Sequence, residues 1–234
     1  MASEAKGPGL LYVNSKITSS ELSTELFTRW YEDVHIADIF KTSGIKAAYR
    51  YYTTSPDPVA VERPYLALYP IRDVTFLQTA EFKSIPIQSD LIPTESKSIF
   101  DLADFDTRYY TSVAKYESST RGKSQSPKTF IMSIQFDLPT GNELSRDKDI
   151  IGWYLTKHES SGSRIRLYRM YFRRQNRLPQ EEGKLAEPPQ YLALHEFDSE
   201  EDLRAFIESP KRPRTEVGAS FSLLKAFGDT EHNF

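Results

Sequence analysis

Residues 26–52 read LFTRWYEDVHIADIFKTSGIKAAYRYY, and their pattern predicts a helix that is followed by a strand. Leu26, Trp30 and Val34 recur every four residues, which is the spacing of one buried face of an α-helix. Gly44 stands where a glycine in the left-handed conformation would end that helix. The Tyr-rich segment after Gly44 has the composition of a strand.

The pattern of residues 26–52 returns in residues 153–171, which read WYLTKHESSGSRIRLYRMY. The repeated landmarks are an aromatic pair, a histidine and a Tyr-Arg pair: Trp30-Tyr31 and Trp153-Tyr154, His35 and His158, Tyr49-Arg50 and Tyr168-Arg169. The predicted elements also recur in the same order, so the matched residues and the order of elements both support a repeat. We therefore interpret the chain as one unit that occurs twice.

Each copy predicts the element order β-α-β-β-α-β, which is the ferredoxin-like unit. The N-terminal unit spans residues 9–117 and the C-terminal unit spans residues 129–229; residues 118–128 lack large apolar side chains and are predicted to be a linker. A ferredoxin-like sheet leaves one face without helices, and that face must be buried. The predicted fold class is therefore α+β, with two tandem ferredoxin-like units that close an α/β barrel within one chain. Such a chain would be a monomer (a pseudo-dimer) or a homodimer.

Three helix starts can be predicted from capping residues. Thr18 and Glu21 have capping-box spacing and predict the start of the first helix. Asp73 predicts a short second helix that ends before Pro86. Ser199 begins a second capping box, in the C-terminal half.

The composition argues against several classes of protein. The 234 residues carry a net charge of -3, which gives no general reason to expect a nucleic-acid or membrane partner. The chain has no cysteine, so we expect no disulfide or thiolate chemistry. No apolar run approaches the ~20 residues of a membrane helix, and the N-terminus does not read as a signal peptide. We expect a cytoplasmic protein, and its 14 Tyr and 14 Phe residues favour a small-molecule cavity with aromatic walls.

Residues 27–51, FTRWYEDVHIADIFKTSGIKAAYRY, resemble the opening of EthD-like members of the dimeric α/β-barrel superfamily. Those proteins have an aromatic pair, a histidine at the end of the first helix, and then a glycine and a strand. The resemblance covers residues 10–53, and the later elements match in order only. Most members build the barrel from two chains, so the resemblance implies a fused form here. The second copy departs from the pattern, because Gly152 lies within its helix and residues 160–163 are serines and a glycine.

The resemblance also implies small-molecule chemistry, as in secondary metabolism. Decarboxylation, cyclisation of polyketide-like aromatics and cofactor-free oxygenation all occur in such barrels. Haem enzymes exist on paired ferredoxin-like barrels too, where one histidine can be an axial ligand, but no motif here favours haem. The four histidines lack the spacing of a metal site. We therefore expect neither a metal nor a cofactor.

Tyr31 and His35 are the candidate catalytic residues. They are four residues apart on a predicted helix and share one face, and an imidazole beside a phenol can act as an acid–base pair near neutral pH. The alternative for His35 is a charged cap at the C-terminal end of the helix dipole. Trp30 is a candidate for substrate binding, with packing in the core as its alternative.

Arg50 and Tyr52 are further candidates for substrate binding. They share one face of the predicted strand, where Arg50 could hold a substrate carboxylate through two hydrogen bonds. A structural ion pair with Asp33 or Asp38 is the favoured alternative for Arg50.

The two halves are expected to differ. Gly152 weakens the helix that carries His158 by about 1 kcal/mol, whereas His35 is followed by apolar residues that could wall a cavity. We therefore expect the N-terminal half to hold the working pocket, with His158 as a lesser candidate for substrate binding. Residues 164–177 hold six arginines and could bind an anion or nucleic acid, but no RNA-recognition pattern accompanies them, and a solvated strand is the favoured expectation.

The leading functional hypothesis is a cofactor-independent enzyme that acts on an aromatic or polyketide-like acid, as a decarboxylase or cyclase of the lyase class. One alternative is a non-catalytic stress-response or interaction scaffold. Another is a cofactor-free or haem-dependent oxygenase. The fold alone does not choose among them.

Overall fold

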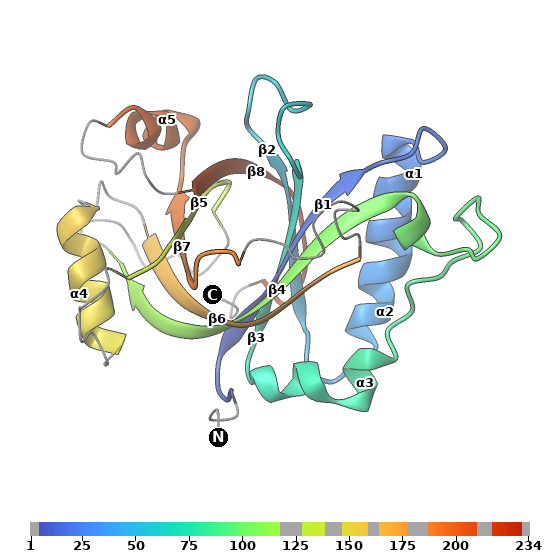
Figure 1. Cartoon of the computed structure of the whole chain (residues 1–234), viewed down its shortest axis with the longest axis horizontal. Coiled ribbons are helices and arrows are strands. Elements are labelled where there is room, and N and C mark those ends of the chain that lie inside the picture. The colour runs from blue at the N-terminus through green and yellow to red at the C-terminus, as the bar shows by residue number, and fades with distance from the viewer. Residues whose placement is uncertain are drawn as a thin grey trace.

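Eight strands form a closed barrel with helices on two sides in the computed structural model (Figure 1). The structure describes residues 5–117, 128–138, 147–158, 164–176, 187–209 and 217–230. The strands are β1 (Gly9–Ile17), β2 (Ala47–Thr53), β3 (Tyr65–Ile71), β4 (Ala103–Tyr116), β5 (Phe130–Phe136), β6 (Arg164–Gln175), β7 (Tyr191–Phe197) and β8 (Val217–Gly228). The helical elements are α1 (Thr24–Arg29), η1 (Trp30–His35), α2 (Ile36–Phe40), η2 (Val74–Gln78), α3 (Ala80–Lys83), η3 (Ile99–Asp101), α4 (Asp147–Lys157) and α5 (Glu200–Glu208).

The strand order confirms the predicted α+β barrel. Around the barrel the order is β1-β3-β2-β8-β5-β7-β6-β4, and neighbouring strands are antiparallel. Each half contributes four adjacent strands in an equivalent arrangement, β4-β1-β3-β2 and β8-β5-β7-β6. The halves meet along two seams, β2–β8 and β4–β6. The predicted linker, residues 118–128, lies outside the described residues except for Lys128, so the boundaries of the two units stay a prediction.

Alternation along the strands divides the apolar core into three clusters. One cluster draws on both halves and fills the barrel; it includes Tyr12, Leu66, Leu194 and Phe221. A second packs the outer face of the N-terminal half against α1, η1 and α2, and a third packs the outer face of the C-terminal half against α4 and α5. The barrel wall therefore separates two helix-covered faces, one in each half.

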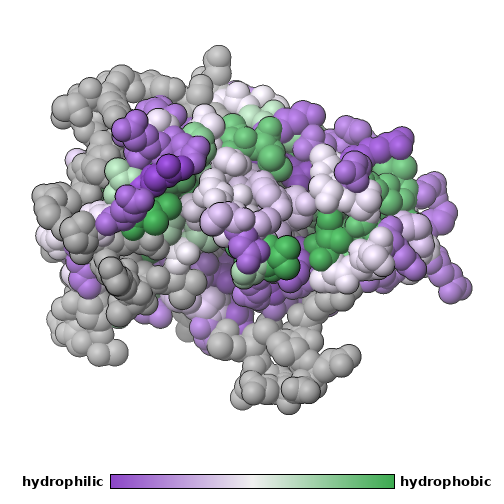
Figure 2. Space-filling view, turned by 90° about the horizontal axis from the view of Figure 1, so that it is seen from above, coloured by the Kyte–Doolittle hydropathy of each residue, from purple (hydrophilic) through white to green (hydrophobic). Residues whose placement is uncertain are grey.

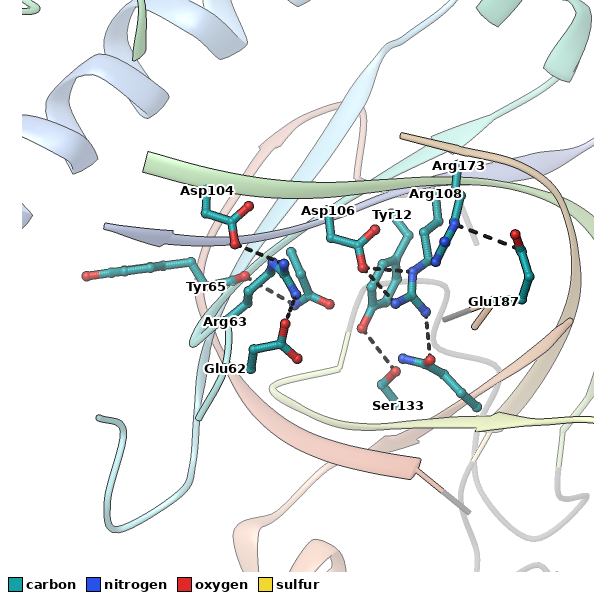
Figure 3. A network of polar contacts seen from close by, with 12 residues as sticks. Tyr12, Glu62, Arg63, Tyr65, Asp104, Asp106, Arg108, Ser133, Arg173 and Glu187 are labelled. Atoms are coloured by element: carbon teal, nitrogen blue, oxygen red, sulfur yellow. Dashed lines mark hydrogen bonds and ion pairs between the residues drawn. The ribbon is translucent and has the colours of Figure 1, made fainter. Parts of the chain in front are cut away.

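A polar network crosses the barrel interior and joins the two halves (Figure 3). The Tyr12 hydroxyl lies 3.1 Å from the Ser133 hydroxyl. Arg108 donates to Asp106 at 2.6 Å and to the side-chain oxygen of Gln135 at 2.6 Å. Ser133 and Gln135 belong to β5, while their partners belong to β1 and β4. The Tyr12–Ser133 and Arg108–Gln135 contacts, the first buried and the second partly buried, therefore link specific positions of one half to specific positions of the other.

The first helix begins later than predicted. Ser23 is its N-cap, and its hydroxyl accepts a hydrogen bond from the Leu26 N–H at 3.1 Å. The predicted capping box at Thr18 and Glu21 is wrong, because the Thr18 N–H donates to the Leu102 carbonyl at 2.9 Å and continues the sheet. Sheet pairing at this position outweighs a good local capping pattern.

The other two predicted helix starts are confirmed. Asp73 caps η2 and accepts from the Thr75 N–H at 3.0 Å. Ser199 caps α5 and accepts from the Asp202 N–H at 3.1 Å.

The predicted left-handed cap at Gly44 is wrong. Helix α2 ends at Phe40, and the described glycines with positive φ are Gly7 and Gly228. A Cβ atom at Gly44 would lie 2.1 Å from the ring of Phe76. Close approach of that ring, rather than backbone conformation, requires a glycine here.

The predicted solvated arginine strand is also wrong in part. Arg164 and Arg166 point into the barrel and are buried. Both form ion pairs with the buried carboxylate of Glu196, at 3.5 and 2.5 Å. Farther along β6, Arg174 is exposed as predicted, and Arg177 lies outside the described residues.

Candidate active site

A cavity of about 680 Å³ lies on the outer face of the N-terminal half, between the sheet and the helices. The helical walls come from η1, α2, η2 and α3, and the sheet walls come from β1, β3, β4 and β6. Its lining is mainly aromatic and aliphatic, and the polar groups in it include Tyr31, His35, Tyr69, Lys83 and Arg174. An apolar cavity with a few convergent polar groups is the usual form of a small-molecule site.

The helix that carries the candidate residues contains one wide turn. The Ile36 N–H donates to the Tyr31 carbonyl five residues earlier, as in a π-helix. Residues five apart would diverge by about 140° in a regular α-helix, but here the rings of Trp30 and His35 stack with centroids 4.8 Å apart. Tyr31 meets the edge of His35 at 5.5 Å. The π turn therefore brings all three rings together at the cavity.

The hydrogen bond of His35 selects its tautomer. Nδ1 lies 3.3 Å from the Pro86 carbonyl oxygen, which can only accept, so Nδ1 carries the proton. Nε2 then keeps its lone pair and has no hydrogen-bond partner among the described residues. Since His35 borders the cavity, this lone pair is available to a ligand.

The surroundings of His35 keep its imidazole neutral. Burial lowers its pKa to about 4 and outweighs the opposing effects of the Pro86 hydrogen bond and of Asp38, while the charges of Arg174 and Arg50 lower it further. His35 is also inside the helix, which continues to Phe40, rather than at its C-terminal end. The alternative of a charged helix cap is therefore wrong.

Tyr31 is positioned as a hydrogen-bond donor. The Tyr69 hydroxyl donates to the Tyr31 oxygen at 3.2 Å, which leaves the Tyr31 proton free to point elsewhere. Burial raises the pKa of Tyr31, and it raises the pKa of Tyr69 well above the ordinary value. Both phenols are thus protonated at neutral pH. Together, Tyr31 and His35 offer a proton donor and a proton acceptor to one cavity.

Arg50 lies behind Tyr31 rather than among the residues that line the cavity. Its side chain is 1% exposed, and its guanidinium stands 4.3 Å from the centroid of the Tyr31 ring. Arg50 does form a structural ion pair, as the favoured alternative predicted. Its partner is Glu32, at 3.5 Å, instead of Asp33 or Asp38. The charge of Arg50 opposes the effect of burial on the pKa of Tyr31.

The structure does not bring Tyr52 or His158 to this cavity. Tyr52 packs against Tyr65, with ring centroids 4.9 Å apart. His158 is 2% exposed in the C-terminal half, where it stacks on Tyr154 at 4.1 Å. The Tyr154 hydroxyl lies 2.8 Å from Nε2 of His195. The repeated Tyr-His pair therefore belongs to a packed core in the second half.

Residues of the C-terminal half complete the cavity, which sequence reasoning did not predict. They are Tyr171, Phe172 and Arg174, all on β6. Strand β6 pairs with β4 along one seam and runs past the cavity, where Arg174 is opposite Thr107. The arginine-rich composition of this segment was visible in the sequence, but its location depends on pairing between distant strands.

Among the described residues there is no group of three or more His, Asp or Glu side chains that could hold a metal ion. In the same part of the chain, no helix has the length and apolar character needed to cross a membrane. On the face shown in Figure 2, apolar residues form separate patches among hydrophilic ones.

Comparison with known proteins gives a curated relative and several solved structures. No family model matches the chain. Core atranone cluster (CAC) protein 1 from Stachybotrys chlorohalonatus strain IBT 40285 is 24% identical over 204 residues, which cover 82% of each protein. The chain is thus similar to a protein that is named for a secondary-metabolite cluster.

The solved structures share the barrel fold. An anthrone oxidase-like protein has a TM-score of 0.55 at 10% identity, covering 97% of this chain and 95% of that one. A proposed monooxygenase from Lactobacillus acidophilus NCFM has a TM-score of 0.53 at 9% identity, covering 97% and 98%. A proposed monooxygenase from Fusobacterium nucleatum subsp. nucleatum ATCC 25586 has a TM-score of 0.52 at 10% identity, covering 97% of each chain. At such identities the similarity establishes the fold alone, and the narrower resemblance to EthD-like proteins stays a prediction.

Proposed function

We propose that the chain is a cofactor-independent enzyme that acts on an aromatic or polyketide-like acid in the cavity of its N-terminal half. The observation that carries this proposal is a neutral His35, with its Nε2 lone pair available, in an aromatic cavity of about 680 Å³. In this proposal His35 and Tyr31 are catalytic and Trp30 contacts the substrate.

The chemistry that fits this pair is removal of a proton from an acidic C–H group. His35 Nε2 accepts the proton, and the Tyr31 O–H donates a hydrogen bond to the oxygen on which negative charge develops. The resulting enolate is the first intermediate of an aldol-type cyclisation, so this chemistry fits our leading assignment of a lyase or cyclase. Arg50, behind the Tyr31 ring, favours partial negative charge on that phenol.

Oxygenation is the second candidate, because three structures with the same fold are named as anthrone oxidase-like or as proposed monooxygenases. The same carbanion can react with dioxygen. A CH₂ group and one O₂ then give a C=O group and one water, so the reaction balances without another reductant. The two candidates share the deprotonation by His35 and differ in the need for O₂.

The test uses an anthrone that carries a carboxyl group, incubated with the protein in D₂O without oxygen. Deuterium uptake at the activated CH₂ is measured by mass spectrometry. We expect the native protein to accelerate exchange about a hundredfold or more, His35→Gln to lose this acceleration, and His158→Gln to keep it. Exchange that does not depend on His35 would reject the mechanism.

Two further measurements separate the candidates. Oxygen consumption and quinone formation in air indicate oxygenation, whereas turnover that is unchanged without oxygen indicates a lyase or cyclase. A visible absorption band of haem in the purified protein would indicate a haem-dependent oxygenase instead. Absence of both exchange and turnover would leave the non-catalytic scaffold as the better hypothesis.

A further inference from the structure

Two cations border the cavity, and neither is paired with an acidic side chain among the described residues. Arg174 on β6 and Lys83 on α3 both line the cavity and are exposed. Neither side chain makes a hydrogen bond or ion pair with any described residue. None of the described residues that line the cavity is Asp or Glu. An uncompensated positive charge beside an apolar cavity attracts an anionic ligand.

The adjacent arginine, Arg173, does have an acidic partner, so the absence of one for Arg174 within the described ranges follows from its place on the strand. Arg173 lies on the opposite face of the strand, since side chains alternate along β6. Its side chain pairs with Glu187 at 4.0 Å. Arg174, one residue later, lines the cavity and has no such partner in the part of the chain that the structure describes.

A bulge in β6 brings aromatic rings to the same place. The register of β4 against β6 shifts so that Tyr109 pairs with Phe172 and Tyr110 pairs with Met170, which leaves Tyr171 as the extra residue. Tyr171 and Phe172 therefore both line the cavity. Phe172 is 49% exposed, and its ring lies 5.0 Å from that of Tyr109. Rings and cations thus adjoin at the exposed border of the cavity.

We propose that Arg174, assisted by Lys83, binds the acidic group of the ligand at the border of the cavity and thereby sets its specificity for aromatic acids. This inference rests on the proposed function, since it concerns the ligand of the same site. A guanidinium binds a carboxylate through two parallel hydrogen bonds, which also fixes the orientation of the attached ring. The ring system then lies against Phe172 and Tyr109.

The contact between Arg174 and the carboxylate of the ligand also affects His35, the proposed catalytic base. The charge of Arg174 contributes to the lowered pKa of His35. A bound carboxylate offsets that charge, so the basicity of His35 increases when the correct ligand is present. Arg174 is in this role a positioning and specificity residue, and it does not take part in proton transfer.

Binding of two fluorescent probes tests the inference. The probes are anthracene-9-carboxylate and the neutral anthracene-9-methanol, and the dissociation constants are measured at pH 7 and low salt. We expect the native protein to prefer the carboxylate and Arg174→Gln to bind it about tenfold more weakly, with no change for the alcohol. Lys83→Gln should have a smaller effect in the same direction, and Arg173→Gln should resemble the native protein.

Three results would overturn this inference: equal affinity of the native protein for both probes, equal loss of both in Arg174→Gln, or no loss in that variant. His35→Gln separates this inference from the proposed mechanism, because it should retain the preference for the carboxylate. If that preference depends on Arg174 while no proton exchange depends on His35, anion recognition stands and the catalytic proposal fails.

Discussion

The imidazole of His35 lies parallel to the indole of Trp30, with centroids 4.8 Å apart and planes inclined by 13°. The stack exists because the π turn places residues five apart on one side of the helix. A neutral imidazole in this position is an apolar stacking partner, whereas a protonated one would be a cation over an indole face. The fluorescence of Trp30 should therefore report the charge of His35.

The first prediction is a fluorescence titration centred near pH 4. Above that pH His35 is neutral, and the pKa of about 4 means that it gains its proton only as the pH falls through that value. We expect Trp30 emission to decrease through the same range in Trp153→Phe, where Trp30 is the remaining tryptophan. Far-UV circular dichroism should be constant across the titration. A midpoint near 6.5, the ordinary value for histidine, would show that His35 is not desolvated.

The second prediction concerns the two related histidines. His35→Ala should abolish turnover or ligand binding and leave the fold intact, because His35 borders the cavity. His158→Ala should leave ligand affinity unchanged, since His158 lies in the core of the other half. The loss of that buried ring should reduce the free energy of unfolding by about 2 kcal/mol. Ligand titration and urea denaturation of both variants make the comparison, and loss of binding in His158→Ala alone would contradict it.

The third prediction concerns the buried guanidinium of Arg50. Arg50→Met removes the buried cation behind Tyr31 and leaves Glu32 with its other partner, the half-exposed Lys225 at 3.0 Å, so we expect a loss of about 2 kcal/mol in the free energy of unfolding. Arg204→Met is the matched control, because the Arg204–Glu200 pair is exposed on α5 and should contribute less than about 1 kcal/mol. Similar losses in both variants, measured by urea denaturation, would show that burial of Arg50 has no special effect.

The fourth prediction uses two glycines with opposite surroundings. Gly44→Ala places a methyl group against the ring of Phe76, 2.1 Å from the added carbon, and should destabilise the protein by about 1–3 kcal/mol. Gly152→Ala adds a methyl group within α4, where no described residue outside the local helix backbone has an atom within 4 Å, and should stabilise the protein by about 1 kcal/mol. Thermal denaturation should give shifts of opposite sign. Stabilisation by Gly44→Ala would mean that Phe76 moves away without cost.

The parts of the fold that the sequence predicted depend on short-range patterns. Alternation in the strands and the repeated order of elements were enough for the barrel, and local hydrogen bonds were enough for the caps at Asp73 and Ser199. The errors depend on contacts between distant segments. Thr18 pairs with the Leu102 carbonyl, and Gly44 adjoins a ring that is 32 residues away in sequence.

In the candidate site, too, short-range patterns were predicted correctly and contacts between distant segments were missed. The helical spacing of Tyr31 and His35 was sufficient to place them on one face. The π turn that adds Trp30 was not predicted, because the four-residue spacing of Leu26, Trp30 and Val34 indicates a regular α-helix. The contribution of Arg174 could not be predicted either, since it requires the register of β4 against β6.

The closure of the barrel within one chain has a consequence for how such a protein can evolve. In a barrel of two identical chains, symmetry copies every substitution into both active sites. Here a codon change alters one side of the barrel alone, so the site at His35 and the core around His158 can be selected independently. One half can specialise in chemistry, while the other half supplies structural support and strand β6, which completes the wall of the cavity.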